Sequence, residues 1–254
     1  MELKQGERID YVNDSLSLIQ DPEGLTFGTD ALLLAGYMEK GYDKALEIGA
    51  GTGIISMLAL KRDKVNTVTA LEVQDEFADL LRRNAELNGL EERLTPVACD
   101  ARDFPTKGEF DCVFTNPPYM RADTGRLNAS SKKTIARHEL YGNINDFIEV
   151  AARALKWGGS FYAVYRPDRL IDLICAMREC AVEPKRMTLV HADTGAIPSI
   201  VLIEGRRGGG TALRVTRPLI IYTDSEHKEY TADMLYIMEN GSFGCGFGVK
   251  NGKN

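Results

Sequence analysis

Polar residues follow four separate apolar runs along this sequence, and their types are those of a ligand site. They are the stretch EIGAGTG (47–53), the acids Glu72 and Asp100, and the stretch NPPY (116–119). In an open α/β sheet the carboxyl ends of parallel strands share one edge, and ligands bind beyond that edge. Four such clusters in chain order therefore predict one site, and together they are more specific than any one of them.

The NPPY stretch carries groups that suit a planar amine. An amino group on an aromatic ring or carbonyl is a poor nucleophile because its lone pair is delocalised. The side-chain oxygen of Asn116 and the backbone carbonyl of Pro117 can accept its two hydrogens, and the proline geometry fixes the direction of that carbonyl. Tyr119 offers a flat face on which a planar substrate stacks. A proline turn with a surface tyrosine is the alternative, which the other three clusters disfavour.

The spacing of the glycine run distinguishes between the possible classes of nucleotide ligand. Dinucleotide enzymes use G-x-G-x-x-G, but Ile54 occupies the third glycine position, which disfavours an NAD-dependent oxidoreductase. No Lys-Ser/Thr pair follows, so the run is not a phosphate-binding P-loop. Glu72 could accept the hydroxyls of a ribose, and Asp100 the amine of an adenine. S-adenosylmethionine, an adenosine without a pyrophosphate, fits these groups, although an acid at a strand end also commonly caps a helix.

The elements that must position these residues alternate between strand and helix. Apolar runs predict strands at 44–49, 67–73, 94–100, 109–116, 160–165, 186–192, 199–205 and 213–222, the last interrupted by Pro218. Helical periodicity predicts helices at 53–62, 74–88, 143–159 and 167–180. This order predicts an α/β fold with a Rossmann-like, doubly wound and mainly parallel sheet, and an antiparallel edge where the last strands have no helix between them.

The chain divides into three parts. We expect an N-terminal segment (1–43) that caps the substrate and cofactor, and a main domain (44–239) that contains a lid-like polar insertion at 120–142. The Gly-rich tail (240–254) is predicted to be disordered.

Composition limits the class of protein. The chain has 254 residues, of which 44% are hydrophobic and 27% charged, and it contains no run of 18 apolar residues and no N-terminal signal core. Its five cysteines show no C-x-x-C spacing, which favours reduced thiols in a cytoplasmic protein without a metal site. The sequence leaves monomer and dimer open.

Charge is distributed unevenly along the chain. The net charge is −6, which argues against a protein that binds nucleic acids non-specifically over its whole surface. Residues 120–139 nevertheless carry a net +3, and residues 205–217 carry four arginines without an acid. Such segments are either a local contact with an anion or solvated loops.

With these motifs, the sequence resembles the class I S-adenosylmethionine-dependent methyltransferases, whose sheet has seven strands. Within them it is similar to the bacterial tRNA1(Val) adenine-N6 methyltransferases, which modify the adenine beside the anticodon. The stretches that carry this resemblance are LSLIQDPEGLTFGTDALLLAGYM (16–38), LRRNAELNGL (81–90), ARHE (136–139), YRPDRL (165–170), EPKRM (183–187) and VLIEGRRGG (201–209).

The resemblance implies a role for individual residues. Glu47, Gly49 and Gly51 would line the methionine and ribose side of the cofactor, Glu72 would hold the ribose, Asp100 would meet the adenine, and Phe27, Gly28, Thr29 and Asp30 would close over the methionine end. Asn116, Pro117 and Tyr119 would hold the target amine, with Asn116 also beside the cofactor. A tRNA partner would be contacted through the insertion, by Arg121, Arg126, Lys132, Lys133 and Arg137. We expect His138 to be structural or solvated.

Three other functions use related motifs. A glutamine-N5 methyltransferase of release factors also acts on a planar amine, but that family has a helical domain before the first motif, where this chain has 46 residues. An rRNA guanine-N2 methyltransferase generally has a duplicated domain. A non-catalytic RNA-binding module is disfavoured by the intact Glu72, Asp100, Asn116 and Tyr119.

Overall fold

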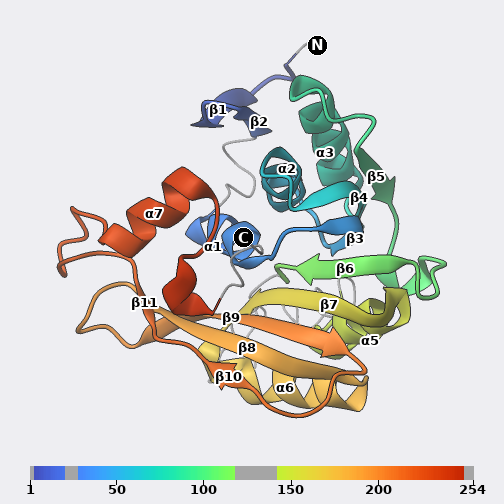
Figure 1. Ribbon diagram of the computed structural model, residues 1–254. Helices are drawn as coiled ribbons and strands as arrows, with labels where there is room; N and C mark the ends of the chain where they lie inside the picture. The colour runs from blue at the N-terminus through green and yellow to red at the C-terminus, as the bar shows by residue number, and fades with distance from the viewer. Residues whose placement is uncertain (1–2, 21–27, 118–141, 249–254) are drawn as a thin grey trace, which may run out of the picture.

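The computed structural model describes residues 3–20, 28–117 and 142–248. A small antiparallel hairpin, β1 (Arg8–Asn13) and β2 (Leu16–Gln20), precedes a large sheet with helices on both faces (Figure 1). The long strands of this sheet are β3 (Tyr42–Ile48), β4 (Val65–Glu72), β5 (Leu94–Ala98), β6 (Phe110–Thr115), β7 (Leu155–Tyr165), β8 (Val182–His191) and β9 (Pro198–Arg207).

The strand order confirms the predicted fold class. The order is β8-β9-β7-β6-β3-β4-β5, and the short strands β10 (Arg214–Val215) and β11 (Leu219–Ile220) both pair with the outer side of β8. Strands β5, β4, β3, β6 and β7 are parallel, whereas β9 is antiparallel to β7 and β8. The chain reverses its direction across the sheet between β3 and β6, which is where doubly wound sheets bind ligands.

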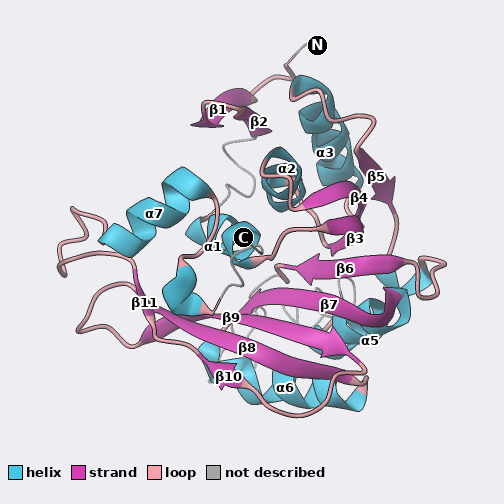
Figure 2. Cartoon of the chain, in the orientation of Figure 1, coloured by secondary structure: helices cyan, strands magenta, loops and turns pink. Residues whose placement is uncertain are grey.

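Helices cover both faces of the sheet (Figure 2). One core contains residues of α1 (Thr29–Tyr37), α2 (Ile54–Lys61), α3 (Asp75–Leu87) and α7 (Ala232–Asn240), and the other contains residues of α5 (Ile144–Ala154) and α6 (Leu170–Glu179). In β6, Cys112 and Phe114 join the first core and Val113 the second, and all three are fully buried. Burial on both faces explains why this strand is a continuous apolar run.

Two predicted boundaries were wrong. The helix expected at 143–159 ends at Ala154, and β7 already begins at Leu155, which pairs with Phe110. The strand expected at 213–222 is split into β10 and β11, which run parallel to β8 rather than antiparallel. Pro218 lies between them, and proline has no N–H for a continuous ladder.

The C-terminal segment is ordered as far as residue 248, so the expectation of disorder from residue 240 was wrong for these residues. A short 3-10 helix, η3 (Cys245–Phe247), follows α7. Phe243 and Phe247 are 2% and 1% exposed and belong to the core that contains α1. The guanidinium of Arg217 lies 4.1 Å from the centre of the Phe247 ring. Two aromatic anchors therefore hold a segment whose composition is dominated by glycine.

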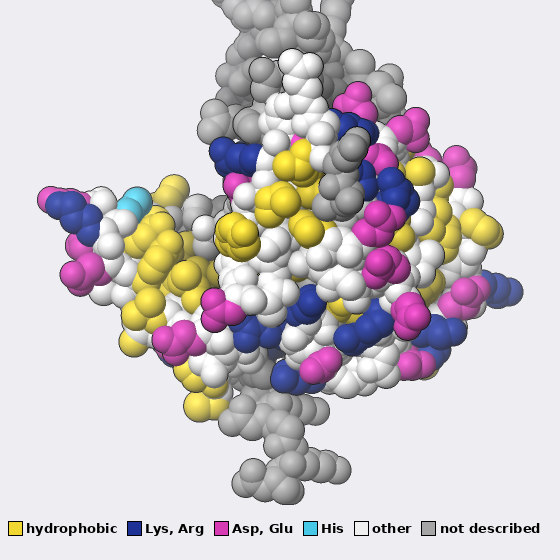
Figure 3. Space-filling model, turned by 90° about the horizontal axis from the view of Figure 1, so that it is seen from above, with side chains coloured by type: hydrophobic (Ala, Val, Ile, Leu, Met, Phe, Trp, Pro, Cys, Tyr) yellow, Lys and Arg dark blue, Asp and Glu magenta, His cyan; other side chains and the backbone are white. Residues whose placement is uncertain are grey.

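Three surface properties of the described residues bear on function. Basic and acidic side chains are interspersed on the face seen in Figure 3, without a single basic patch. No helix in the described ranges is long and apolar enough to cross a membrane. All five cysteines are free; Cys112 is buried, whereas Cys175 and Cys245 are exposed.

Candidate functional site

The glycine-rich turn follows β3 at the point where the strand order reverses. Gly49, Gly51 and Gly53 have φ angles of 71°, 55° and 85°, which glycine adopts without steric cost. A side chain at Gly53 would also collide with Leu81 of α3. At Gly51, an added Cβ would meet no atom within 4 Å. The backbone of the turn is therefore packed at one end and open to a ligand in its middle.

Two carboxylates hold this turn. Glu72 accepts hydrogen bonds from the backbone N–H of Gly51 (2.8 Å, Oε2) and of Gln74 (2.9 Å, Oε1). Glu47 Oε2 accepts from the backbone N–H of Ser56 (3.2 Å) and from the Ser56 hydroxyl. The other oxygen, Glu47 Oε1, is buried and has no hydrogen-bond partner among the described residues. Glu47 therefore keeps one acceptor for a group outside the described part of the chain.

Burial also changes the acidity of Glu47. Desolvation raises the pKa of this carboxyl to about 8, although the hydrogen bonds from Ser56 act in the opposite direction, and the charge of Glu72 raises it further. A cation beside Oε1 would favour the ionised form. Glu47 thus fits a ligand that carries positive charge, as the methionine end of S-adenosylmethionine does.

Asp100, the acid after β5, is engaged by its own loop. It accepts from the backbone N–H of Arg102 (2.9 Å) and caps the 3-10 helix η1 (Ala101–Asp103). Its Oδ2 also lies 2.5 Å from Arg102 Nη2, and this pairing holds the pKa of Asp100 below its usual range. The capping role that the sequence left as an alternative is present, so an adenine amine would have to share this carboxylate with Arg102.

Asn116 lies just beyond the end of β6. The hydroxyl of Thr115 donates to the carbonyl of Ile48 (2.8 Å), which ties the end of β6 to the end of β3. Asn116 Nδ2 donates to Oδ2 of Asp30 at 3.3 Å, across 86 residues of sequence. Asn116 Oδ1 is buried and has no partner among the described residues. Because an unpaired buried acceptor is unfavourable, this oxygen suits a ligand that brings N–H groups.

Asp30 reaches Asn116 from the first turn of α1. Its other oxygen, Oδ1, accepts from the backbone N–H of Ala31 at 3.1 Å. A side chain at Gly28, the residue before the helix, would collide with this same oxygen. Thr29 is exposed. The structure therefore brings Asp30, in the first turn of α1, to Asn116 at the end of β6, and Gly28 and Thr29 are its chain neighbours.

A cavity of about 470 Å³ opens beside Pro117. It is walled by the start of α5, the residues after β7 and one side of α6, and the side chains of Tyr165, Arg166 and Arg169 line it. Phe147 lines it too and packs against Gly49, so this ring lies between the cavity and the glycine turn. None of the carboxylates of Glu47, Glu72 and Asp100 lines the cavity, which is thus a second compartment beside the turn.

Arg166 and Arg169 are two cavity residues for which the sequence predicts no role. Arg166 pairs with Asp168 (2.7 Å) and Arg169 with Asp172 (2.5 Å), and all four side chains are at least one third exposed. Such exposed pairs contribute little to stability, so a bound anion can replace the carboxylate partner. Their presence in the stretch YRPDRL (165–170) is the sequence signal that points to this cavity.

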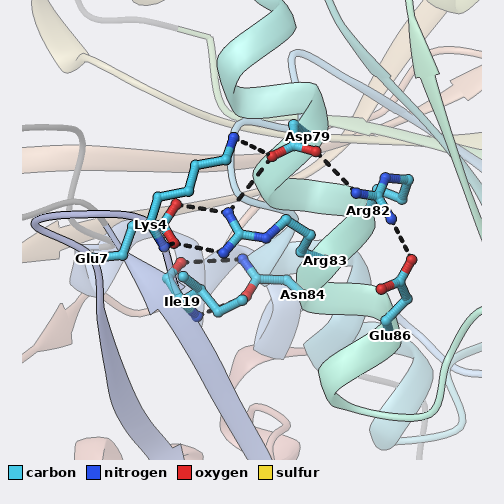
Figure 4. A network of polar contacts seen from close by, with 8 residues as sticks. All are labelled: Lys4, Glu7, Ile19, Asp79, Arg82, Arg83, Asn84 and Glu86. Atoms are coloured by element: carbon cyan, nitrogen blue, oxygen red, sulfur yellow. Dashed lines mark hydrogen bonds and ion pairs between the residues drawn. The ribbon is translucent and has the colours of Figure 1, made fainter. Parts of the chain in front are cut away.

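A second group missed from the sequence joins the N-terminal hairpin to the glycine turn. The side chain of Asn84 on α3 accepts from the N–H of Ile19 (2.7 Å) and donates to its carbonyl (3.3 Å; Figure 4). It also donates to the carbonyl of Thr52 at 3.1 Å. Close by, Arg83 pairs with Glu7 within an almost fully buried contact. One asparagine thus connects β2 to the turn that carries Gly51.

The arginines of the basic segment at 205–217 bind groups of the chain itself. Its four arginines contact internal partners: Arg206 the carbonyl of Gly158, Arg207 that of Cys180, Arg214 that of Gly248, and Arg217 the carboxylate of Asp233. Arg206 pairs across the sheet with Ser160, in the middle of β7 and five residues before Tyr165. The arginines of this segment therefore have partners within the chain, and Arg206 lies away from the carboxyl end of β7.

Several predicted site residues lie outside the described residues: Phe27, Tyr119, Arg121, Arg126, Lys132, Lys133 and Arg137, together with His138 and the predicted insertion up to residue 141. In the part of the chain that is described, no group of His, Cys, Asp and Glu side chains has the arrangement of a metal site.

Two curated relatives with similar sequences carry the same name. A protein from Dyadobacter fermentans named tRNA1(Val) (adenine(37)-N6)-methyltransferase is 28% identical over 59% of this chain and 62% of its own length. A protein of the same name from Phocaeicola vulgatus is 25% identical over 74% of this chain and 79% of its own length. The chain spans about three fifths of the length of the first of these relatives.

Solved structures share the fold. A predicted O-methyltransferase from Agrobacterium tumefaciens matches with a TM-score of 0.66 and 23% identity, over 84% of this chain and 96% of that one. A geranyl diphosphate C-methyltransferase from Streptomyces coelicolor, in complex with S-adenosyl-L-homocysteine, matches with a TM-score of 0.53 and 15% identity, over 70% and 75%. A family model described as methyltransferase small domain matches residues 23–176. Because this match covers more than half of the chain, the protein belongs to the methyltransferase small domain family.

Proposed function

We propose that this protein transfers a methyl group from S-adenosylmethionine to the N6 amine of the adenine beside the anticodon of tRNA1(Val). Membership of the methyltransferase family and the common name of the relatives, at 25% and 28% identity, support this reaction. Its substrate implies a cytoplasmic location.

The observation that carries the proposal is the buried, unpaired Oδ1 of Asn116, which has no partner among the described residues. The opposite end of the same amide is held by Asp30. An acceptor fixed in this way, followed directly by the carbonyl of Pro117, matches the two N–H groups of an exocyclic amine. A hydroxyl substrate has only one hydrogen to donate and would leave one of the two acceptors unpaired.

The glycine turn and its carboxylates would hold the cofactor. Gly49 and Gly51 would allow the cofactor to approach the backbone closely, Glu72 would offer the remaining lone pairs of its carboxylate to the ribose hydroxyls, and Glu47 Oε1 would accept from the charged methionine end. Asp100 would accept from the adenine together with its Arg102 contact. When bound, S-adenosylmethionine supplies a methyl group on a positively charged sulfur.

The residues of the chain prepare the amine for attack. Asn116 Oδ1 and the Pro117 carbonyl accept the two amine hydrogens, which frees the nitrogen lone pair from the ring and directs it away from both acceptors. The nitrogen–carbon bond forms as the sulfur–carbon bond breaks, and the nitrogen then loses one proton to solvent. Positioning and electrostatics account for catalysis, since the leaving group needs no acid. The cavity beside Pro117 is large enough for part of a nucleotide next to the flipped base.

The test is methyl transfer from labelled S-adenosylmethionine to total tRNA and, separately, to a purified release factor. We expect label in tRNA, lost when the adenine beside the anticodon of tRNA1(Val) is replaced by guanine. Label in the release factor alone would give the glutamine-N5 reaction instead.

The Asn116→Ala variant tests the assigned acceptor. It should bind S-adenosylmethionine with unchanged affinity and lose nearly all turnover. Asn66 provides a matched control, because its exposed side chain also donates to an aspartate, Asp43, at 3.1 Å. Asn66→Ala should retain full activity; normal turnover in Asn116→Ala would refute the role of Asn116.

A further inference from the structure

We propose that Asp30 is a positioning residue that sets which end of the Asn116 amide faces the substrate. This inference rests on the proposed amine methylation, and it gives Asp30 a role other than contact with the cofactor. The two ends of an asparagine amide have nearly the same shape and opposite hydrogen-bonding character. An amine substrate requires the oxygen, and a rotation of the amide by half a turn would present the NH2 group.

The contact with Asp30 distinguishes the two orientations. With Nδ2 toward Asp30, the amide donates to a carboxylate oxygen at 3.3 Å, and Oδ1 is left for the substrate. In the reversed orientation, the amide oxygen would face the carboxylate oxygen at a similar distance. Two acceptors without a hydrogen between them repel each other, so the reversed orientation is disfavoured.

Asp30 can act in this way because its own carboxylate is fixed. Its Oδ1 accepts from the N–H of Ala31, so Oδ2 is the oxygen that remains for Asn116. The neighbouring helix residues Leu33 and Leu34 are fully buried and anchor α1 in the core. The absence of a side chain at Gly28 leaves room for Oδ1. The orientation of the amide is therefore determined by the helix.

This geometry predicts an unusual order of variant activities. In Asp30→Asn, the oxygen of the introduced amide continues to accept from Ala31, so the introduced NH2 group faces Asn116 and favours the reversed orientation of that side chain. We expect kcat to fall at least about tenfold, the equivalent of one hydrogen bond. In Asp30→Ala neither orientation is imposed and the substrate can select the oxygen, so kcat should fall less. The isosteric substitution is thus more damaging than the truncation.

A paired substitution restores the pattern. Asn116→Asp alone places two carboxylates against each other and should lower kcat at least about tenfold. When Asn116→Asp is combined with Asp30→Asn, the NH2 group introduced at position 30 can donate to one oxygen of the carboxylate introduced at position 116. The other oxygen of that carboxylate can accept from the substrate. We expect the double variant to recover at least about tenfold over Asn116→Asp.

The measurements are kcat, the Kd of S-adenosylmethionine by titration calorimetry, and the melting temperature. The Kd should change less than about twofold in Asp30→Asn, because the contact with Asn116 is not a cofactor contact. The exposed control Asp43→Asn, which makes the same substitution at the similar contact with Asn66, should leave kcat unchanged. Three results would each overturn the inference. They are a lower kcat in Asp30→Ala than in Asp30→Asn, no recovery of kcat in the double variant, and a higher Kd with normal kcat in Asp30→Asn. All assays use the acceptor that the wild-type chain labels, so a wrong choice of tRNA as substrate leaves this test intact.

Discussion

Asn116 and Glu47 each bury an acceptor oxygen that has no partner among the described residues. Most buried polar atoms in proteins are paired, so two such oxygens at the carboxyl ends of the adjacent strands β3 and β6 support the proposed ligand site at this edge. The ligand-free state should consequently be less stable at this edge than the ligand-bound state.

Glu47 makes the free energy of unfolding depend on pH. Its pKa is raised to about 8 in the folded chain, against an ordinary value of 4.5. Between these pH values the folded state holds a proton that the unfolded state has released, so folding becomes less favourable as the pH rises. The contribution of Glu47 to the free energy of unfolding is therefore full below about pH 4.5 and is lost as the pH rises to about 8. We expect Glu47→Gln to remove this loss, which amounts to several kcal/mol at about 1.4 kcal/mol per pKa unit.

Urea denaturation of the wild type and Glu47→Gln, from about pH 5 to about pH 8.5, measures the effect. The difference between the two proteins should be used, because Lys64 has its pKa lowered by burial to about 7 and stabilises the fold as the pH rises from about 7 upward. Glu91→Gln, an exposed substitution, is the control. A pH-independent difference between wild type and Glu47→Gln would contradict the prediction.

Single residues were predictable where the chemistry was local. The turn at Gly49–Gly53 follows from residue types and spacing. The acceptor role of Asn116 rests on the same kind of local argument and stays a prediction. The capping of η1 by Asp100 was foreseen only as an alternative, because an acid after a strand serves both purposes. The partner of Asn116 lies 86 residues away, and no local pattern specifies such a contact.

At the scale of elements, α3 serves as a side support for the hairpin β1–β2. Asn84 and Asn88 are one helical turn apart and exchange hydrogen bonds with the backbone of Ile19 and Ser17, respectively. Their amides thus take the place of a neighbouring strand along β2. This pairing explains why the two stretches, distant in sequence, both take part in one resemblance.

We predict that Asn84→Ala destabilises both the hairpin and the glycine turn. It leaves the N–H of Ile19 and the carbonyl of Thr52 without their present partner, at a cost of about 1–3 kcal/mol. Urea denaturation should show this loss, hydrogen exchange should show faster exchange at Ile19, and the affinity for S-adenosylmethionine should fall. Asn66→Ala is the exposed control; an unchanged Ile19 exchange rate would argue against the connection.

The second prediction at this scale concerns the cavity between α5, β7 and α6. If Arg166 and Arg169 contact phosphates, replacing both by Gln should weaken tRNA binding and reduce the slope of log K against log salt by about 0.7 per lost contact. S-adenosylmethionine binding should be unaffected. Filter binding at several salt concentrations gives the slope.

Arg206→Gln is the matched control for this experiment, since it alters an exposed arginine of β9 that pairs with the middle of β7, away from the cavity. It should leave the slope unchanged. Equal slopes for the wild type and the double variant would exclude Arg166 and Arg169 from RNA contact.

Elements were largely predictable because strand and helix periodicities differ and the strands are buried on both faces. The end of α5 was not predictable from the sequence, since residues 155–158 fit the pattern of a helix as well as that of a strand. The pairing of Leu155 with Phe110 places them in β7. The hairpin β1–β2 was missed because its order depends on α3 rather than on its own composition.

At the scale of the whole molecule, the first core is closed by both early and late parts of the chain. Arg186 is buried on β8, its guanidinium donates to the carbonyl of Tyr37 (2.8 Å), and it lies 4.0 Å from the centre of the Tyr37 ring. The same guanidinium lies 3.5 Å from the carbonyl of Phe247. The end of α1 and the segment after α7 therefore both contact the buried guanidinium of Arg186.

Replacement of Phe247 should show how much this segment contributes. We expect Phe247→Ala to lower the free energy of unfolding by about 3–5 kcal/mol, since a fully buried aromatic side chain is removed. Tyr236→Ala, whose ring is 47% exposed, should cost far less. Equal losses in urea denaturation of the two variants would show that the segment does not support the core.

The closure of this core also sets an order of events during synthesis. Residues 31–60 enter the core early in translation, but Phe243 and Phe247 complete it only after residue 247 has been made. A nascent chain that stalls before this point exposes apolar surface on α1 and lacks one partner of Arg186. Because α1 also carries Asp30, which holds Asn116, full packing of the helix behind this contact requires translation beyond residue 247.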